Sequence, residues 1–276
     1  MSIETSRLAA PPGACDCHMH IYEDRFPLAA TATFKPPHAP PSAYRDVQRN
    51  LGITRAIVVQ PTGYGFDNRC TLEGMAALGP GARGIAVVRP EVAEAELLRL
   101  TDAGIRGVRF HMQPGGVLPW DALEGLAAKV LPFGWHVQLQ LDGRDLPEHE
   151  ARLAKLPCRL VVDHVGKFGQ PGTTPEHAGF KALLRLLDSG NCWVKLSAPY
   201  ETSKVGPPHY DDVRPLARAL AKANPERCVW ASNWPHPNQK TVPSTAAMLD
   251  LLLDWVDDTA TRTRILVDNP VELYGF

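Results

Sequence analysis

The chain has 276 residues, of which 44% are hydrophobic and 21% charged, and this composition excludes a mainly disordered protein. Its 29 basic side chains balance 30 acidic ones, so the sequence lacks the basic face of a nucleic-acid binder and the polybasic patch of a membrane-surface protein. No stretch approaches the roughly 20 apolar residues of a membrane span. Residues 1–13 lack the apolar core of a signal peptide, so we expect a cytoplasmic protein whose six cysteines are free thiols.

Short apolar runs rich in β-branched residues alternate with helix-like segments along the chain. The predicted strands are residues 14–20, 55–60, 84–88, 107–111, 136–141, 159–164, 192–197 and 228–233. The predicted helices are residues 42–51, 68–78, 93–103, 120–130, 145–156, 178–189, 211–223, 244–255 and 259–267.

Strands that alternate with helices are typical of βαβ units and a parallel sheet. Eight strands of continuous apolar character suit a closed sheet that is buried on both faces. We therefore predict the α/β class: a single (β/α)8 TIM barrel over residues 1–276, with an amino-terminal extension over 1–13. An open doubly wound sheet is the alternative, but no GxGxxG follows the first predicted strand.

Three long segments without helical periodicity follow predicted strands. Residues 28–41 are rich in proline and are predicted to form a loop over the mouth of the barrel, while residues 168–176 and 199–209 follow the sixth and seventh strands. In (β/α)8 barrels the loops at the carboxyl ends of the strands carry the active site. We expect the functional site at that face.

Polar side chains cluster where the predicted strands end. His18 and His20 stand two residues apart on the first strand and therefore point to the same side. A single histidine at a strand end is more often a core residue, but histidines from three strands converge on one predicted face. The candidate residues at these ends are His18, His20, Arg109, His164, Asn233 and His236.

Several of these residues lie in motifs that resemble a known family. The segments DCHMHIY (16–22), VVDHVGKFG (161–169) and WASNWPHPN (230–238) are similar to the amidohydrolase superfamily. Within it, they and the segments 58–72 and 265–276 most resemble the branch of 2-pyrone-4,6-dicarboxylate lactonases and galactarolactone isomerases. The resemblance spans residues 14–276 and implies an enzyme that acts on a lactone of a small sugar acid or dicarboxylic acid.

The departures from the superfamily pattern bear on metal binding. The resemblance implies that zinc-holding members use the histidine pair of the first strand, further histidines after the fifth and sixth, and an aspartate after the eighth. Here the fifth predicted strand ends in Gln138 and Gln140, and the aspartate position is Asn233. A neutral amide is a poor zinc ligand, and lactonases of the branch work without metal, so we expect no cofactor. A zinc-dependent amidohydrolase is the alternative.

Asn233 also bears on the reaction. In the lactonases the aspartate at this position is taken to be the general base, and an amide cannot accept a proton near neutral pH. Galactarolactone isomerases also have asparagine here, and segments 114–116 and 200–203 resemble theirs. They convert a 1,5-lactone to a 1,4-lactone by attack of an internal hydroxyl, which needs less activation than water.

We therefore prefer lactone isomerisation. The alternatives are hydrolysis, with His164 or His236 as base, and a carboxylate-binding barrel without activity. An introduced asparagine at residue 233 would favour hydrolysis.

The resemblance and the residue chemistry together suggest roles. His18, His20 and His164 would donate hydrogen bonds to the developing oxyanion. Asn233 would hold a hydroxyl or the ring oxygen, and Arg109 would bind a substrate carboxylate, with a salt bridge at the rim as its alternative. His236 would shuttle a proton or contact substrate, or else only anchor its loop.

Other residues and partners complete the prediction. The weaker substrate-binding candidates in the mouth loops are Tyr64, Lys167 and Tyr200. Lys195 is interpreted as barrel packing or rim. The expected partner is a small lactone that carries a carboxylate, and a homo-oligomer stays open.

Overall fold

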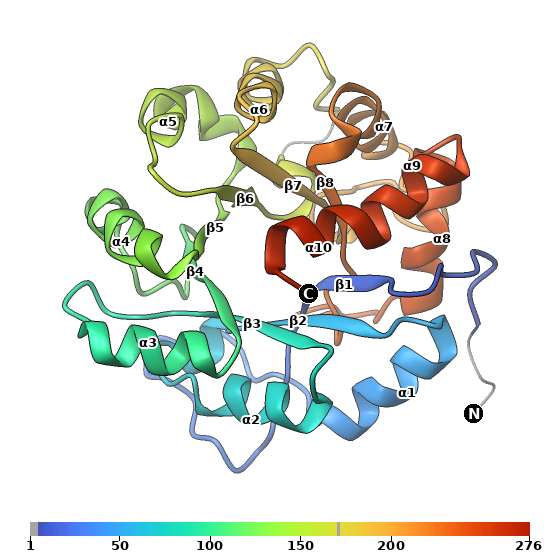
Figure 1. Cartoon of the computed structure of the whole chain (residues 1–276). Coiled ribbons are helices and arrows are strands. Elements are labelled where there is room, and N and C mark those ends of the chain that lie inside the picture. Colours follow the sequence, from blue (N-terminus) through green and yellow to red (C-terminus); the bar gives the residue numbers. More distant parts are fainter. Residues whose placement is uncertain (1–4, 170–171) are drawn as a thin grey trace.

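The computed structural model describes residues 5–169 and 172–276, and its eight strands form one parallel sheet in which each strand pairs with the next in chain order (Figure 1). Residues 1–4 of the predicted extension and 170–171 of the predicted loop 168–176 lie outside the described residues. The strands are β1 (Cys15–Met19), β2 (Arg55–Val59), β3 (Ala82–Ala86), β4 (Ile105–His111), β5 (His136–Gln140), β6 (Leu160–Val162), β7 (Cys192–Leu196) and β8 (Cys228–Trp230).

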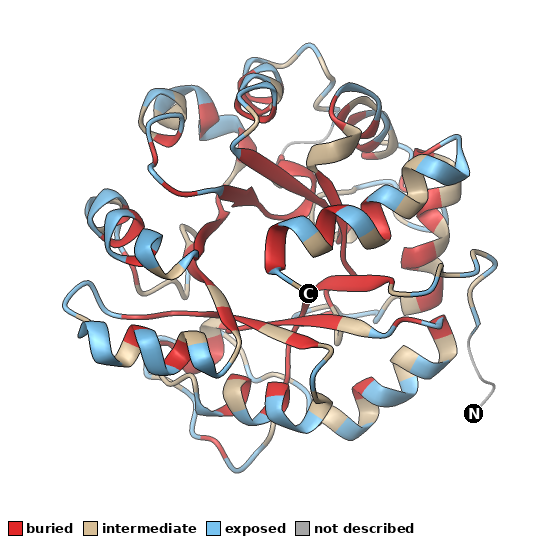
Figure 2. Cartoon of the chain, in the orientation of Figure 1, coloured by how far each residue is buried: buried red, intermediate tan, exposed pale blue. Residues whose placement is uncertain are grey.

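Helices surround this sheet and bury their inward faces against it (Figure 2). They are α1 (Pro41–Leu51), α2 (Arg69–Leu78), α3 (Glu94–Asp102), α4 (Leu123–Val130), α5 (Leu146–Leu153), α6 (Ala178–Asp188), α7 (Arg214–Ala223), α8 (Thr245–Trp255), α9 (Thr259–Thr263) and α10 (Asn269–Tyr274). The predicted (β/α)8 TIM barrel is confirmed. Among the described residues, none of the helices has the length and apolar character needed to cross a bilayer.

The barrel closes between β1 and β8 at the level of the predicted site. The backbone N–H of Asn233 donates to the carbonyl of His18 at 2.8 Å, and the N–H of His20 donates to the carbonyl of Trp234 at 2.8 Å. Closer to the amino ends of the strands, the buried Asp16 carboxylate accepts from the backbone N–H of Ser232 at 2.9 Å and from the Tyr44 hydroxyl of α1 at 2.9 Å. The closure therefore fixes His18, His20 and Asn233 relative to one another.

Seven of the eight strands end one to three residues earlier than the sequence predicts, and two of these early ends, those of β6 and β8, lie at the predicted site. β6 stops at Val162 and β8 at Trp230, whereas the apolar runs extend to residues 164 and 233. The reason is backbone conformation: His164 has φ 54° and Asn233 has φ 59°, in the left-handed region that a strand cannot contain. These two residues therefore turn the chain into the mouth of the barrel.

Two strands begin earlier than predicted: β3 at Ala82 instead of residue 84, and β4 at Ile105 instead of residue 107. Gly84 is not a turn residue but a strand residue against which α2 packs: a Cβ built there would lie 2.2 Å from Met75 Sδ and 2.6 Å from Ile105 Cδ1. The glycine lets the helix approach the sheet closely.

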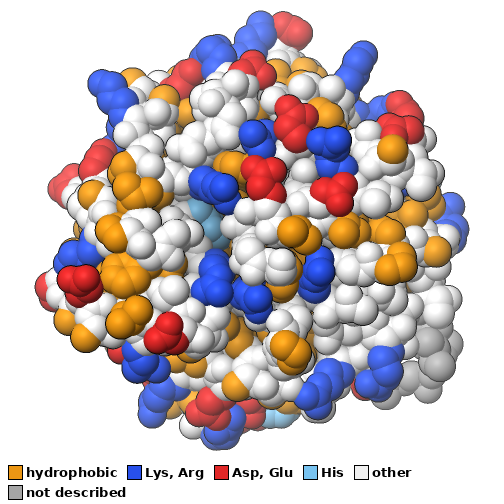
Figure 3. Space-filling view, viewed as in Figure 1, with side chains coloured by type: hydrophobic (Ala, Val, Ile, Leu, Met, Phe, Trp, Pro, Cys, Tyr) orange, Lys and Arg blue, Asp and Glu red, His pale blue; other side chains and the backbone are white. Residues whose placement is uncertain are grey.

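The amino ends of the strands are covered by the carboxyl-terminal segment, which lies beside β1 (Figure 1). Leu273 and Tyr274 of α10 are buried in a small cluster under the barrel with Cys15 and Cys17. Basic and acidic side chains both lie on this face (Figure 3). Arg55 and Arg83 lie against the ring of Phe276, with their guanidinium carbons 5.1 and 4.9 Å from its centroid. The opening of the barrel is therefore at the carboxyl ends of the strands.

All six cysteines, each in the described part of the chain, are buried free thiols.

Candidate active site

A cavity of about 340 Å³ opens at the carboxyl ends of the strands. The mouth loop predicted over residues 28–41 contributes Thr33 and Phe34 to its wall. The ionisable and amide side chains that line it include His20, Arg109, His111, Gln140, His164, Lys167, Glu201 and Asn233. It thus brings together five of the predicted site residues: His20, Arg109, His164, Lys167 and Asn233.

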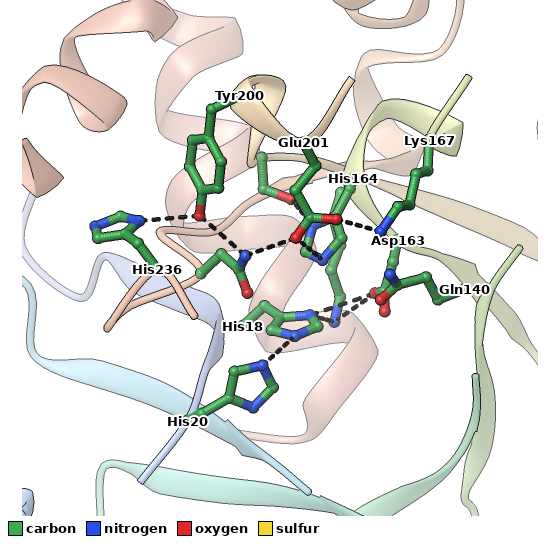
Figure 4. A network of polar contacts seen from close by, with 12 residues as sticks. His18, His20, Gln140, Asp163, His164, Lys167, Tyr200, Glu201 and His236 are labelled. Carbon is green, nitrogen blue, oxygen red and sulfur yellow. Dashed lines mark hydrogen bonds and ion pairs between the residues drawn. The ribbon is translucent and has the colours of Figure 1, made fainter. Parts of the chain in front are cut away.

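His18 of β1 and His20, which directly follows this strand, meet at the floor of this site (Figure 4). His18 Nε2 lies 3.2 Å from His20 Nε2, and His20 Nδ1 lies 2.8 Å from the carbonyl oxygen of Val59. Burial lowers the pKa of His18 well below its usual value, and burial together with Arg109 lowers the pKa of His20 to about 3, so both rings are neutral near pH 7.

These contacts determine which nitrogen carries hydrogen. The Val59 carbonyl can only accept, so Nδ1 of His20 is protonated and its Nε2 is the acceptor. His18 must then carry its hydrogen on Nε2 and present an unprotonated Nδ1.

Two partners of His18 Nδ1 are donors, as this tautomer requires, while Asp163 Oδ1 lies 3.4 Å from the same nitrogen. Lys195 Nζ lies 3.1 Å from His18 Nδ1 and 3.2 Å from Asp163 Oδ1, and Gln138 Nε2 lies 3.4 Å from the same ring nitrogen. Lys195 and Asp163 are fully buried and form an ion pair. Burial raises the pKa of Asp163, but the Lys195 ammonium and His18 outweigh it and hold that pKa well below its usual range. An ammonium group therefore hydrogen bonds to the inner side of the His18 ring.

Glu201 forms a second charged group on the opposite wall (Figure 4). It lies in the short helix η6 (Pro199–Glu201) after β7, and its carboxylate bonds to Lys167 Nζ. Oε1 of Glu201 also accepts from Asn233 Nδ2 at 3.1 Å and lies 3.9 Å from His164 Nε2. Burial raises the pKa of Glu201, but His164 and Lys167 lower it to about 2, so the group is ionised.

His164 lies between the two charged groups. Its Nδ1 is 2.8 Å from the Ser197 hydroxyl, and its ring centroid is 4.8 Å from that of His18. Burial lowers the pKa of His164, while Glu201 and Asp163 act in the opposite direction. His164 is therefore a neutral imidazole beside a carboxylate, an arrangement that can accept a proton.

Asn233, Tyr200 and His236 form a hydrogen-bonded chain behind the cavity. An ionised Glu201 can only accept, so the Asn233 amide must present Nδ2 to it, and the same Nδ2 donates to Tyr200 Oη at 2.9 Å. Tyr200 Oη lies 2.9 Å from His236 Nδ1, and His236 Nε2 lies 2.9 Å from Thr245 Oγ1. Burial lowers the pKa of His236 to about 4. Both ring nitrogens of His236 are thus engaged, and neither His236 nor Tyr200 lines the cavity.

Arg109 reaches into the cavity from β4. Its Nη1 donates to the carbonyl of Gln60 at 3.0 Å and its Nη2 to Gln140 Oε1 at 2.8 Å, while Nε is buried without a partner among the described residues. Asp163 is 3.8 Å away but is closer to Lys195. The guanidinium is thus held in place and leaves donors for an anion.

The structure separates the remaining predictions. His18 is fully buried beneath the cavity, and Tyr64 lies outside it with its hydroxyl bonded to the backbone of Glu23 at 3.1 and 3.2 Å. The interpretation of Lys195 as packing or rim is wrong, because its ammonium contacts His18 and Asp163 at the floor of the site. One sequence signal could have found it: a lysine inside an apolar strand must have a charged partner.

The residues that form the site hold uncommon backbone conformations. His164, Asn233 and His236 have φ angles of 54°, 59° and 60°. Non-glycine residues rarely adopt this region, and such residues cluster where a fixed geometry serves function. The side chains are therefore placed by the fold before any ligand binds.

Within the described part of the chain, one cluster offers metal ligands: single atoms of His18, Asp163 and His164 lie within 4.8 Å of one another. Lys195 Nζ, however, lies within 3.2 Å of both His18 Nδ1 and Asp163 Oδ1, so an ammonium group already occupies these two ligand atoms. Asn233 adds an amide that donates to Glu201. This donor set does not fit a zinc ion, which needs several anionic or imidazole ligands free to coordinate it.

Comparison with known proteins identifies a matching family and several similar proteins. Residues 15–276 match the amidohydrolase family Amidohydro_2. The chain is 36% identical to the D-galactarolactone isomerase of Agrobacterium fabrum, covering 96% of this chain and 92% of that protein. It is 35% identical to a 2-pyrone-4,6-dicarboxylate hydrolase of Comamonas testosteroni, covering 96% and 90%. An apo crystal structure from Agrobacterium tumefaciens superposes with a TM-score of 0.92 at 35% identity, covering 99% of both chains.

Proposed function

Because the chain belongs to the amidohydrolase family, we propose that it is a metal-independent enzyme acting on a lactone of a small, carboxylate-bearing acid, and that its reaction is lactone isomerisation. Two relatives of at least 35% identity are named as enzymes of lactone substrates, one an isomerase and one a hydrolase. The cavity of about 340 Å³ suits a small molecule.

The single observation that carries the choice of isomerisation is Asn233. Its amide donates to Glu201 and Tyr200, and an amide cannot take a proton from water near neutral pH. A substrate hydroxyl held next to its own ester carbonyl has a high effective concentration and needs weaker activation than water. The named isomerase relative supports the same choice.

Arg109 binds the substrate carboxylate in this proposal. The Lys167 and Lys195 side chains are closely paired with Glu201 and Asp163, whereas the Arg109 guanidinium is 3.8 Å from its carboxylate neighbour Asp163. Its fixed guanidinium suits a carboxylate.

His18 polarises the ester carbonyl in this proposal. His18 carries hydrogen on Nε2, where its present partner is neutral His20, while the Lys195 ammonium hydrogen bonds to its Nδ1. That ammonium draws electron density from the ring and makes Nε2–H a stronger donor to a developing oxyanion. In this proposal His18 Nε2–H is the donor that stabilises the tetrahedral intermediate. The predicted donor roles of His20 and His164 do not fit, because Nδ1 of His20 holds its hydrogen for the Val59 carbonyl and Nδ1 of His164 is engaged by Ser197.

The reaction exchanges one acyl C–O bond for another. The attacking hydroxyl oxygen bonds to the carbonyl carbon and loses its proton, and the tetrahedral intermediate then breaks the bond to the ring oxygen, which gains a proton. No water is consumed and no proton is released overall.

Proton NMR of the purified enzyme with D-galactaro-1,5-lactone in mildly acidic buffer tests the proposal. The expected result is the 1,4-lactone appearing ahead of the open acid, at a rate unchanged by prior dialysis against a chelator. Absence of catalysed lactone conversion would contradict the lactone assignment, and activity lost to the chelator and restored by zinc would contradict metal independence.

Hydrolysis of the same substrate class is the second candidate, favoured by the hydrolase relative at 35% identity. In that case the open acid appears first in the same NMR experiment, and a water takes the place of the internal hydroxyl.

A further inference from the structure

The Glu201 carboxylate lies where three cavity side chains meet. Oε1 accepts from Asn233 Nδ2 at 3.1 Å and lies 3.9 Å from His164 Nε2, while Lys167 Nζ bonds to Oε2. All four residues line the same cavity (Figure 4). The side chain of Glu201 is 14% exposed, so its charge acts with little screening by solvent.

The proposed acyl transfer needs a group that takes a proton from the attacking hydroxyl and returns it to the leaving oxygen. Asn233 cannot do so, and His236 has both nitrogens engaged away from the cavity. His164 lines the cavity, its Nδ1 is held by Ser197, and its Nε2 has Glu201 as its charged neighbour. A neutral imidazole whose cation is stabilised by a nearby carboxylate is a suitable proton carrier.

Resting on the proposed function, we propose that Glu201 is a positioning residue that stabilises the protonated form of His164 and so replaces the carboxylate missing at residue 233. In the first half of the reaction, the hydroxyl proton moves to His164 Nε2 as the new C–O bond forms. In the second half, Nε2 returns the same proton to the ring oxygen as the old C–O bond breaks. The proton count balances without any co-reactant.

The charged groups that face His164 predict the direction in which its pKa changes when one of them is removed. Glu201 from η6 and the adjacent Asp163 favour its protonated form, whereas Lys167 and Lys195 disfavour it. Two neutral histidines also face it: His18 of β1 and His20, which directly follows β1. Removing Glu201 or removing Lys167 should therefore shift the protonation of His164 in opposite directions, which a general loss of structure would not do.

The experiment is an NMR titration of the His164 ring in histidine-labelled protein, with its signal assigned by comparison with His164→Gln. We expect the pKa of His164 to fall in Glu201→Gln and to rise in Lys167→Met. Glu96→Gln is the matched control, because Glu96 pairs with Arg99 on the surface of α3; we expect it to leave the titration unchanged. Circular dichroism checks that each variant folds.

Turnover provides the second readout. The acid limb of the pH profile of kcat/KM should move to lower pH in Glu201→Gln and to higher pH in Lys167→Met. At neutral pH kcat should fall by about tenfold or more in Glu201→Gln and by about 100-fold or more in His164→Gln. A Glu201→Asp variant should restore part of the rate.

The two proposals fail separately. The titration uses no substrate, so an unchanged pKa of His164 in Glu201→Gln and Lys167→Met, or shifts in the same direction, overturns the role of Glu201 whatever the enzyme converts. If the enzyme converts no lactone but the two variants shift the pKa of His164 in opposite directions, the proposed function is overturned. The electrostatic effect of Glu201 on His164 then still stands. If Glu201→Gln does not fold, the expected rise in the pKa of His164 in Lys167→Met still tests the role of Glu201.

Discussion

At the scale of single residues, the site depends on which polar atoms are already paired. Asn233 shows this most clearly, because its Nδ2 atom donates to Glu201 and to Tyr200 at 3.1 and 2.9 Å. An aspartate in the same place would bring a second carboxylate against Glu201. The amide is therefore part of the charge balance of the cavity and not merely a lost base.

An Asn233→Asp variant tests this balance. Two carboxylates in contact cannot both ionise easily, so one pKa of the pair formed by Glu201 and the introduced carboxylate is raised above its unfolded value. The folded state then holds more protons than the unfolded state, and the stability of the variant falls as pH rises through that pKa. We expect a loss of roughly 1–3 kcal/mol at neutral pH that shrinks in acid.

Urea denaturation in acid and at neutral pH measures this difference. Adding Glu201→Gln to Asn233→Asp removes the repulsion and should recover most of the stability. A single variant as stable as the natural chain at neutral pH would contradict the proposed contact.

Arg109 gives a second prediction at this scale. Replacing Arg109 by Met removes the charged hydrogen bonds to the substrate carboxylate, which are worth about 1.5–3 kcal/mol. We expect KM to rise roughly 10–100-fold with a smaller change in kcat, measured by steady-state kinetics on the lactone. The control is Arg89→Met, since Arg89 is exposed against the ring of Phe66. Equal effects of the two substitutions would argue against carboxylate binding by Arg109.

The histidine cluster could be predicted from the sequence, whereas its charged partners could not. Residues two apart on a strand share a face, so His18 and His20 had to point the same way. Lys195 lies in a run that is apolar on both faces, and the register that turns it inward depends on the pairing of β7 with its neighbours. Glu201 lies in a loop whose course no periodicity encodes, although it stands in a segment that resembles a related enzyme.

At the scale of elements, α10 covers the end of the barrel at which the strands begin. Tyr274 is fully buried beneath the strands, its ring lies 5.4 Å from that of His136, and its hydroxyl has no partner among the described residues. Its contribution is therefore expected to come from the ring and not from the hydroxyl.

Two substitutions of Tyr274 separate these contributions. Tyr274→Ala should destabilise the fold by roughly 3–5 kcal/mol, as other deletions of a buried aromatic ring do. Tyr274→Phe should be neutral or slightly stabilising, because removing a hydroxyl without a partner removes only its burial penalty. Denaturant unfolding measures both, and a large loss in Tyr274→Phe would show that the hydroxyl is paired.

The existence of all eight strands could be predicted from composition and spacing, but some of their ends could not. Apolar runs continue through residues 164 and 233, yet both residues adopt positive φ and end the strand pairing before them. That conformation is imposed by the packing of the mouth, so it does not show in the local sequence.

At the scale of the whole molecule, neutral buried histidines link stability to pH. Burial lowers the pKa of His136 and of His111 to about 3, that of His20 likewise to about 3, and that of His236 to about 4. In the unfolded chain these groups titrate near 6.5. Between these values the unfolded state binds more protons than the folded state, so stability is complete above about pH 6.5 and falls as pH is lowered.

The free energy of unfolding should therefore decrease between neutral pH and pH 4, by up to about 1.4 kcal/mol per pH unit for each such histidine. His136→Leu should make this dependence shallower by one proton, since neither ring nitrogen of His136 has a hydrogen bond within the described residues. Denaturant unfolding at several pH values measures the slope. A slope that is the same in the variant would contradict a neutral, buried His136.

The central claim is that the enzyme moves an acyl group between oxygens of its own substrate. Running the reaction with D-galactaro-1,5-lactone in oxygen-18-labelled water, with mass analysis of the early 1,4-lactone, tests this most directly. The account predicts a 1,4-lactone without solvent oxygen, because the internal hydroxyl is the nucleophile. A 1,4-lactone that carries one labelled oxygen on its acyl carbon would contradict the account, because water would then be the attacking group.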